Sequence, residues 1–198
     1  HHGISKNPNS TQVMLRILCL KSSDQSVHLN VVFHPALENK CPDELFSVKS
    51  DYVVKTIAET MELNESQIIA CLKSKSLKKA LLKNPNLSAE ILSTLFDTLD
   101  ESELESVSQN PNLKPEQLYT LSKSNSVKVR ASLAASTSLN LKVFNQLSGD
   151  KNEAVLVALA RNESAPVDLL NSLSKNNSKH IREAVACNKS TQDSTLLS

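Results

Sequence analysis

Two apolar positions, four residues apart, recur along the chain about every 26 residues. The first position holds Val27, Val53, Leu77, Glu103, Val129, Val155 and Ile181, and the second holds Val31, Ile57, Leu81, Val107, Leu133, Leu159 and Val185. Residues four apart share one face of an α-helix, so each pair predicts a helix with one buried stripe. The residues beside the second position are mostly small, such as Ala80, Ala134 and Ala160, which predicts close approach between neighbouring helices.

A second apolar pattern precedes each of these helices. Large apolar residues three apart follow an Asn-Pro element or its counterpart, as in Leu15 and Leu18, Leu92 and Leu95, Leu118 and Leu121, Phe144 and Leu147, and Leu170 and Leu173. Asparagine can bond to the backbone two residues on and proline fixes its own φ, so the element predicts a turn before a helix. Each repeat is therefore expected to contain two helices joined by a polar turn.

The repeats cover nearly the whole chain. Asn84-Pro85-Asn86-Leu87 recurs as Asn110-Pro111-Asn112-Leu113, and repeats start near residues 7, 34, 60, 84, 110, 136, 162 and 188. A unit of about 26 residues cannot bury its own apolar face, so the copies must stack. The prediction is an all-α solenoid of about seven two-helix repeats, forming one domain over residues 7–198.

The two ends of the chain carry separate expectations. His1 and His2 begin a segment, residues 1–6, that is interpreted as a disordered remnant of an expression tag. At the other end, Thr191 replaces the usual leucine and a polar run, residues 192–195, follows it. A polar last unit is typical of a solenoid cap, so we expect a genuine C-terminus there.

The Asn-Pro-Asn-Leu element, a short helix with Glu90 or Glu116 before its leucine anchor, and Val129-Arg130 followed by Leu133-Ala134 resemble the leucine-rich repeat variant family. More broadly, the pattern is similar to HEAT-like α-solenoids. The resemblance implies a right-handed superhelix of two layers, in which the first helix is short or 3₁₀, and a binding scaffold without catalysis. Some members of the family carry a cysteine-rich iron–sulfur segment, but this chain has no such cluster, so no cofactor is expected.

The composition excludes several classes of function. Aromatic residues make up 3% of the chain and only two glycines occur, which excludes a P-loop and a GxGxxG dinucleotide fingerprint. The net charge is +1, so no global field recruits nucleic acid or membrane, and no apolar run is long enough to cross a bilayer. The four cysteines lie far apart and are expected to be free thiols of a cytoplasmic protein, with a removed signal peptide as the open alternative.

No catalytic or metal-binding constellation stands out. His28 and His34 are six residues apart, which fits no HExxH spacing, and no nucleophile has a glycine-rich elbow. We therefore predict a protein that is not an enzyme and holds no metal.

One column alternates basic and aliphatic residues: His28, Val54, Lys78, Leu104, Arg130, Leu156 and Arg182. In one interpretation, His28, Lys78, Arg130 and Arg182 form a row that binds carboxylates or phosphates of a partner. In the other, each arginine lays its stem over a neighbouring helix and bonds to turn carbonyls. The second interpretation is favoured.

Glu103 is the one charged residue in the first apolar column. A register shift that buries Leu104 and exposes Glu103 is the favoured explanation, and a loosely packed seam is the alternative.

The leading function is a scaffold that binds a partner protein along one face of the solenoid. Binding of a nucleic-acid backbone along the basic row is the second possibility, and a structural or accessory module is the third. The sequence leaves the partner and the oligomeric state open.

Overall fold

A computed structural model of the chain describes residues 1–191. Every regular element in that range is helical, apart from one isolated parallel bridge between Lys40 and Glu62. The helices group into two compact units, His1–Ser88 and Ala89–Ser198.

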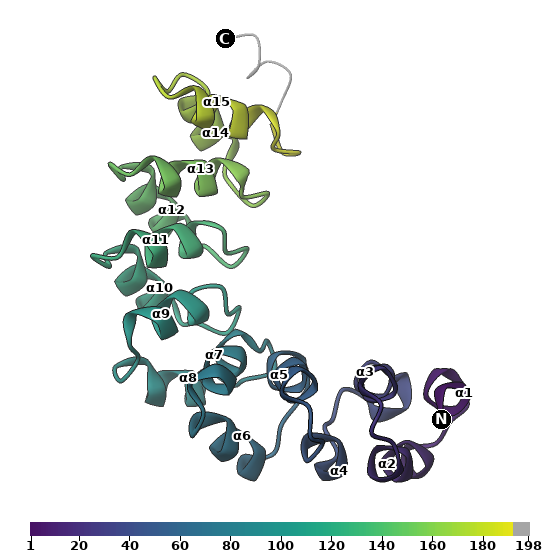
Figure 1. The fold of residues 1–198 in the computed structure, drawn as a ribbon. Coiled ribbons are helices and arrows are strands. Elements are labelled where there is room, and N and C mark those ends of the chain that lie inside the picture. The colour runs from purple at the N-terminus through teal and green to yellow at the C-terminus, as the bar shows by residue number, and fades with distance from the viewer. Residues whose placement is uncertain (192–198) are drawn as a thin grey trace. The chain divides into compact units, whose positions relative to one another are not determined.

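Unit 1 contains the first eight helices (Figure 1). They are α1 (His2–Lys6), α2 (Gln12–Lys21), α3 (Gln25–Val32), the 3₁₀ helix η1 (Pro35–Leu37), α4 (Asp43–Phe46), α5 (Asp51–Thr60), α6 (Glu65–Leu72) and α7 (Lys75–Lys83). The extra residues of the second repeat form a loop in which Glu38 and Asn39 have positive φ angles of 50° and 66°. The bridge to Glu62 closes this loop, because Glu62 donates to the Asn39 carbonyl and accepts from the Cys41 amide.

Unit 2 contains four further helix pairs (Figure 1). The first helices of the pairs are α8 (Ala89–Phe96), α10 (Pro115–Ser122), α12 (Leu141–Ser148) and α14 (Val167–Leu173). The second helices are α9 (Glu101–Val107), α11 (Val127–Ala134), α13 (Glu153–Arg161) and α15 (Lys179–Ala186). The second helices pack against one another in chain order, and α10 packs against α12, so the pairs form two layers.

The predicted core positions are confirmed. Every member of the second apolar column, from Val31 to Val185, is buried. In the first column only Leu77 is partly exposed. The fold class is therefore confirmed as an all-α stack of helix pairs, with seven pairs, α2/α3 to α14/α15, among residues 1–191.

The first helices are short, as predicted, and most are α-helical and not 3₁₀. Apart from α4 they are α-helices of seven to ten residues, and among residues 1–191 the 3₁₀ geometry is confined to Pro35–Leu37. Side-chain caps explain several of them, since Thr11, Asn64 and Asn140 each accept a backbone N–H of the first turn. A first turn whose backbone N–H groups have hydrogen-bond acceptors stabilises an α-helix.

Two further expectations differ from the structure. Residues 2–6 form the helix α1 rather than a disordered segment, because the buried Ser5 receives a hydrogen bond from Asn30 and Ser10 donates to the Ile4 carbonyl. Glu103 is buried and not exposed, because it completes a capping box with Asp100 in which each side chain accepts the other's backbone N–H. The expected cap at residues 192–195 lies outside the described residues.

Buried asparagine side chains tie several repeats to the one before them. The Asn162 amide donates to the carbonyls of Ala134 and Ser136 at 2.8 and 2.7 Å, and Asn188 donates likewise to Ala160 and Asn162. Each Oδ1 meanwhile accepts the backbone N–H two residues on. The asparagine that marks the start of a repeat in sequence is therefore a buried connector between repeats.

Other residues also occupy this slot, among them His34 and Ser136. His34 accepts the Ala36 amide at Nδ1, and its Nε2 lies 2.9 Å from the Asn7 carbonyl, so the ring carries its proton on Nε2. Ser136 keeps only the local bond, accepting the Ser138 amide at 3.3 Å.

Candidate functional site

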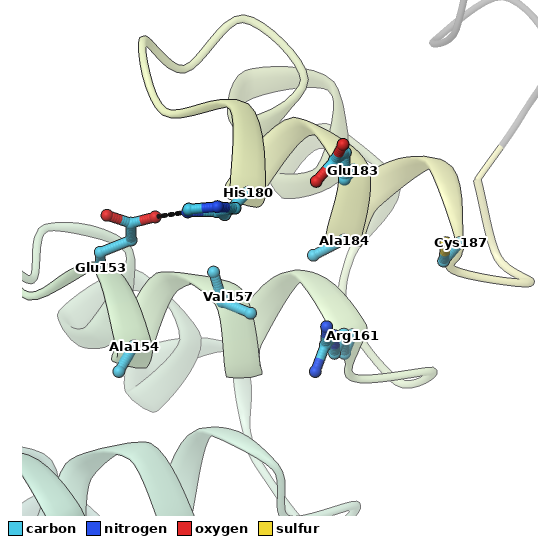
Figure 2. Close-up of a pocket in the computed structure, with 8 residues that line it drawn as sticks. All are labelled: Glu153, Ala154, Val157, Arg161, His180, Glu183, Ala184 and Cys187. Carbon is cyan, nitrogen blue, oxygen red and sulfur yellow. Dashed lines mark hydrogen bonds and ion pairs between the residues drawn. The ribbon is translucent and has the colours of Figure 1, made fainter.

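An open groove of about 860 Å³ lies over the outward faces of α13 and α15 in unit 2 (Figure 2). Ala154, Val157 and Ala184 form its apolar part. Charged side chains surround them, and the groove is lined in addition by Glu153, Arg161, His180, Glu183 and Cys187. The small residues that let the two helices approach closely thus leave a shallow apolar strip with charged edges.

One hydrogen-bonded pair crosses the groove at its α13 N-terminal end. His180 Nδ1 lies 2.7 Å from Glu153 Oε1, which also accepts the Ser178 hydroxyl at 2.8 Å. Hydrogen bonds from Ser178 and then His180 hold the pKa of Glu153 below its ordinary value. The carboxylate is thereby fixed as an anion at neutral pH.

The groove contains a thiol, an imidazole and a carboxylate, but they do not form a catalytic triad. Cys187 follows His180 by seven residues in α15 and its cap, a rise of about 10 Å, whereas proton transfer needs hydrogen-bond distance. Figure 2 shows Cys187 at the end of the groove away from His180. Cys187 and His180 therefore lack the contact that a nucleophile and its general base require.

Arg130 is held in a clamp. Its Nε lies 2.6 Å and its Nη2 3.2 Å from the two carboxylate oxygens of Asp150, while Nη1 donates to the carbonyls of Ser124 and Asn125. Both side chains are largely buried, 17% and 8% exposed. Burial would raise the pKa of Asp150, but hydrogen bonds from Arg130 and from the Asn152 amide, together with the Arg130 charge, hold it below its ordinary value. The contacts match the interpretation in which the arginine bonds to turn carbonyls.

Arg182 shares part of this arrangement. Its Nη1 donates to the carbonyls of Asn176 and Asn177 at 2.9 and 3.0 Å, which are six and five residues earlier, as for Arg130. In contrast to Arg130, the side chain is exposed, and no residue between 1 and 191 supplies a carboxylate to it.

The other two members of the predicted basic row lie in unit 1. Lys78 is partly buried in α7. His28 is 4% exposed, and neither of its ring nitrogens has a hydrogen-bond partner. The expectation that His28 belongs to an exposed binding row is therefore not met: its ring is buried and lines a cavity of about 380 Å³ in unit 1.

A second exposed apolar surface lies on α2 of unit 1. Val13, Ile17 and Leu20, spaced to share one helix face, are 65%, 46% and 71% exposed. Contiguous exposed apolar side chains are typical of protein contact surfaces.

Metal and thiol chemistry have little support in the described part of the chain. No group of three or more His, Cys, Asp or Glu side chains is placed to hold a metal ion within residues 1–191. All four cysteines are free, and burial raises the pKa of Cys19 to about 11 and of Cys41 to about 12. Those two thiols are protonated and unreactive at neutral pH. In the same residues no helix is both long enough and apolar enough to span a bilayer.

The stacked helix pairs define an α-helical repeat protein of the solenoid class. The chain is similar to a solved structure described as a leucine-rich repeat variant with a novel repetitive protein structural motif: the two are 18% identical, with a TM-score of 0.48, and the match covers 91% of this chain and 72% of the other. No protein-family model and no curated protein matches the sequence. The packing of the chain's own repeats, and not this likeness, carries the assignment of its class.

Sequence patterns did not single out the groove residues. Glu153, Val157 and Arg161 lie on one outward face of α13, but this face mixes charged and apolar residues. Such a mixture does not stand out in the sequence from an ordinary solvent-exposed face. The groove arises where this face meets the equivalent face of α15, and that adjacency is a property of the stack.

Proposed function

We propose that the protein is a non-catalytic scaffold that binds a partner polypeptide in the groove over α13 and α15. The observation that supports this most directly is the composition of the groove: Ala154, Val157 and Ala184 provide an apolar strip, and charges of both signs stand beside it. A helix or extended segment with a few apolar anchors fits such a surface, and its charged side chains would pair with Arg161, Glu153 or Glu183.

A nucleic-acid backbone is a poorer fit. Of the four residues in the predicted basic row, Arg130 is already neutralised by Asp150 and His28 is enclosed. Backbone binding needs several accessible cations, because its affinity comes from neutralising phosphates. Binding of nucleic acid is therefore an outcome that the test distinguishes, and not a second proposal.

The test compares binding by variants within the groove and outside it. Polypeptides captured by the wild-type protein from lysate of its source cells, after nuclease treatment, would be purified and their affinities measured directly. Arg161→Glu reverses an exposed charge at the groove, Val157→Glu places a charge on its apolar strip, and Thr120→Glu is the control on the exposed side of α10.

The proposal predicts that both groove variants lose about tenfold or more in affinity, equivalent to about 1.4 kcal/mol, while Thr120→Glu binds as wild type. Unaltered thermal unfolding of Arg161→Glu would show that the loss is local. Equal binding by all four proteins would contradict the proposal, and capture that disappears with nuclease would favour the nucleic-acid function.

A further inference from the structure

The cavity of about 380 Å³ in unit 1 lies between the turn before α3 and the turn before α5. The His28 ring lines it, and neither ring nitrogen has a hydrogen-bond partner within residues 1–191. Nearly all buried polar groups of native proteins have a partner, from the protein itself or from a bound molecule. Ser22, Ser23, Glu44 and Lys49 supply further polar groups to the wall of the cavity.

The cavity has an equivalent in unit 2. His28 and Arg130 both lie four residues after the N-cap of a second helix, and Val48 and Asp150 both lie two residues before the next such N-cap. The equivalent place in unit 2 is also a cavity, of about 410 Å³, and further helix pairs precede and follow it there. Its opening is therefore a feature of the two turns and does not depend on the end of a stack.

The two places differ in what bonds to the first turn. In unit 2 the Arg130 guanidinium donates to the Ser124 and Asn125 carbonyls. The equivalent carbonyls in unit 1 belong to Ser22 and Ser23, and they accept no hydrogen bond from any residue between 1 and 191. The arginine and aspartate of the unit 2 clamp are histidine and valine in unit 1, so the carbonyls remain available to a donor in the cavity.

The wall of the unit 1 cavity also has a carboxylate, because Glu44 replaces Gln146 of unit 2. Arg16 Nε lies 3.0 Å from both Glu44 oxygens, and its hydrogen bonds hold the pKa of Glu44 below the ordinary value. A carboxylate has about four acceptor positions, so Glu44 can take a further donor. Lys49 is exposed on the same wall, and its counterpart Lys151 lines the unit 2 cavity together with a guanidinium.

We propose that the unit 1 cavity binds a guanidinium group. The Ser22 and Ser23 carbonyls and the Glu44 carboxylate accept its hydrogen bonds, and the His28 ring forms a wall beside it. A guanidinium is planar, carries N–H donors in fixed directions and stacks on aromatic rings, so it matches this set of groups. Its carrier is a free guanidino compound or an arginine side chain of a polypeptide. The cavity belongs to unit 1, so its test is independent of the groove in unit 2.

The probe is methylguanidinium, titrated into the full chain and followed by NMR. The reporters are the backbone amide signals of Ser23 and Asp24, each of which follows one of the two turn carbonyls. The amides of Asn125 and Ser126 are the internal control, because Arg130 already donates to the carbonyls before them. Methylammonium has the same charge without the planar fork and is the control compound.

We expect saturable shifts at Ser23 and Asp24, a dissociation constant of about 1–10 mM, and binding of methylammonium that is at least about fivefold weaker. The control amides of unit 2 should not move. Tighter binding of free arginine would identify a free compound as the carrier, and tighter binding of N-acetylarginine methylamide would identify a polypeptide. Equal responses to the two cations, or linear shifts up to about 50 mM, would overturn the proposal.

Variants of the cavity wall test its location. His28→Arg combined with Val48→Asp rebuilds the unit 2 pair, so this protein should no longer bind methylguanidinium. Glu44→Gln should weaken binding by about threefold to tenfold, whereas Glu65→Gln, at an exposed position of α6, should bind as wild type. Unchanged binding in the rebuilt pair or in Glu44→Gln would overturn the proposal. Glu44→Gln decides alone if the rebuilt pair does not fold.

Discussion

The side-chain amide of Asn188 donates a hydrogen bond of 2.8 Å to the backbone carbonyl of Asn162, the residue in the same slot one repeat earlier. Asn162 in turn reaches back to Ser136. The slot thus connects successive repeats directly, in addition to shaping the turn within each repeat. Stability in such an array depends on interfaces between neighbours, so these buried amides are natural points at which to test it.

Replacing Asn162 with alanine should destabilise the protein strongly. The change removes two buried hydrogen bonds to the preceding repeat and the local bond to the Ser164 amide, and leaves buried carbonyls without that donor. We expect a loss of about 2–4 kcal/mol in the free energy of unfolding, measured with urea. Asn125→Ala, at an exposed turn position, should change it by less than about 0.5 kcal/mol. Similar effects for the two variants would contradict the connecting role of the slot.

Placing an asparagine where the slot lacks one should stabilise the protein. Ser136 occupies the same slot but makes only the local bond to Ser138. By the spacing seen at Asn162 and Asn188, an asparagine at 136 would reach the carbonyls of Ser108 and Asn110. Ser136→Asn is expected to raise the free energy of unfolding by about 1 kcal/mol. Thr137→Asn, one residue on and exposed, is the control, and a destabilised Ser136→Asn would show that this slot cannot accept the longer side chain.

The Arg130–Asp150 clamp predicts a specific dependence of stability on pH. The pKa of Asp150 is lowered in the folded state, so its contribution is fully present above the unfolded pKa of about 3.9 and is lost as the pH falls through the folded value. The difference in unfolding free energy between wild type and Asp150→Asn should therefore shrink below about pH 4. A difference that stays constant from pH 7 to pH 3 would mean that the clamp does not stabilise the fold.

At neutral pH, Arg130→Ala should cost about 1–3 kcal/mol, because it leaves a largely buried carboxylate and two turn carbonyls without their donor. Arg182→Ala should change stability by less than about 0.5 kcal/mol, because its side chain is exposed. Equal losses in the two variants would contradict the distinction between the largely buried Arg130–Asp150 pair and the exposed Arg182.

The two buried histidines of unit 1 make a matched pair. Neither ring nitrogen of His28 has a partner, whereas both nitrogens of His34 are bonded. His28→Leu should therefore stabilise the protein by about 1 kcal/mol, while His34→Leu should destabilise it by about 1–3 kcal/mol. Thermal unfolding of the two variants would test this, and a destabilised His28→Leu would point to a polar partner for the ring.

The apolar column predicts a large cost for cavity formation. Leu133 and Leu159 are completely buried, so either leucine changed to alanine should lower the free energy of unfolding by about 2–5 kcal/mol. Leu141, which is 63% exposed, serves as the control. A loss under about 1 kcal/mol at Leu133 would mean that α11 packs in another register.

The repeat spacing predicts most of the fold. The Val31-to-Val185 column was sufficient to find every second helix, because a residue with the same burial recurs at a fixed interval. Where a local device replaces the apolar contact, the pattern misleads: Glu103 is buried by its capping box with Asp100, which the Asp-x-x-Glu spacing could have indicated. The enclosed His28 and the groove over α13 and α15 could not be predicted in this way, because both depend on how neighbouring helices are set against each other.

The most direct test of the binding groove is photo-crosslinking with benzoylphenylalanine placed singly at Val157, at Thr120 and at Ile17. Val157 is in the groove, Thr120 is on the exposed side of α10, and Ile17 is on the exposed apolar face of α2. The account predicts that Val157 crosslinks the captured polypeptide and that Thr120 does not. A polypeptide that crosslinks equally from all three positions, or from Ile17 and not from Val157, would contradict the assignment of the groove as the binding site.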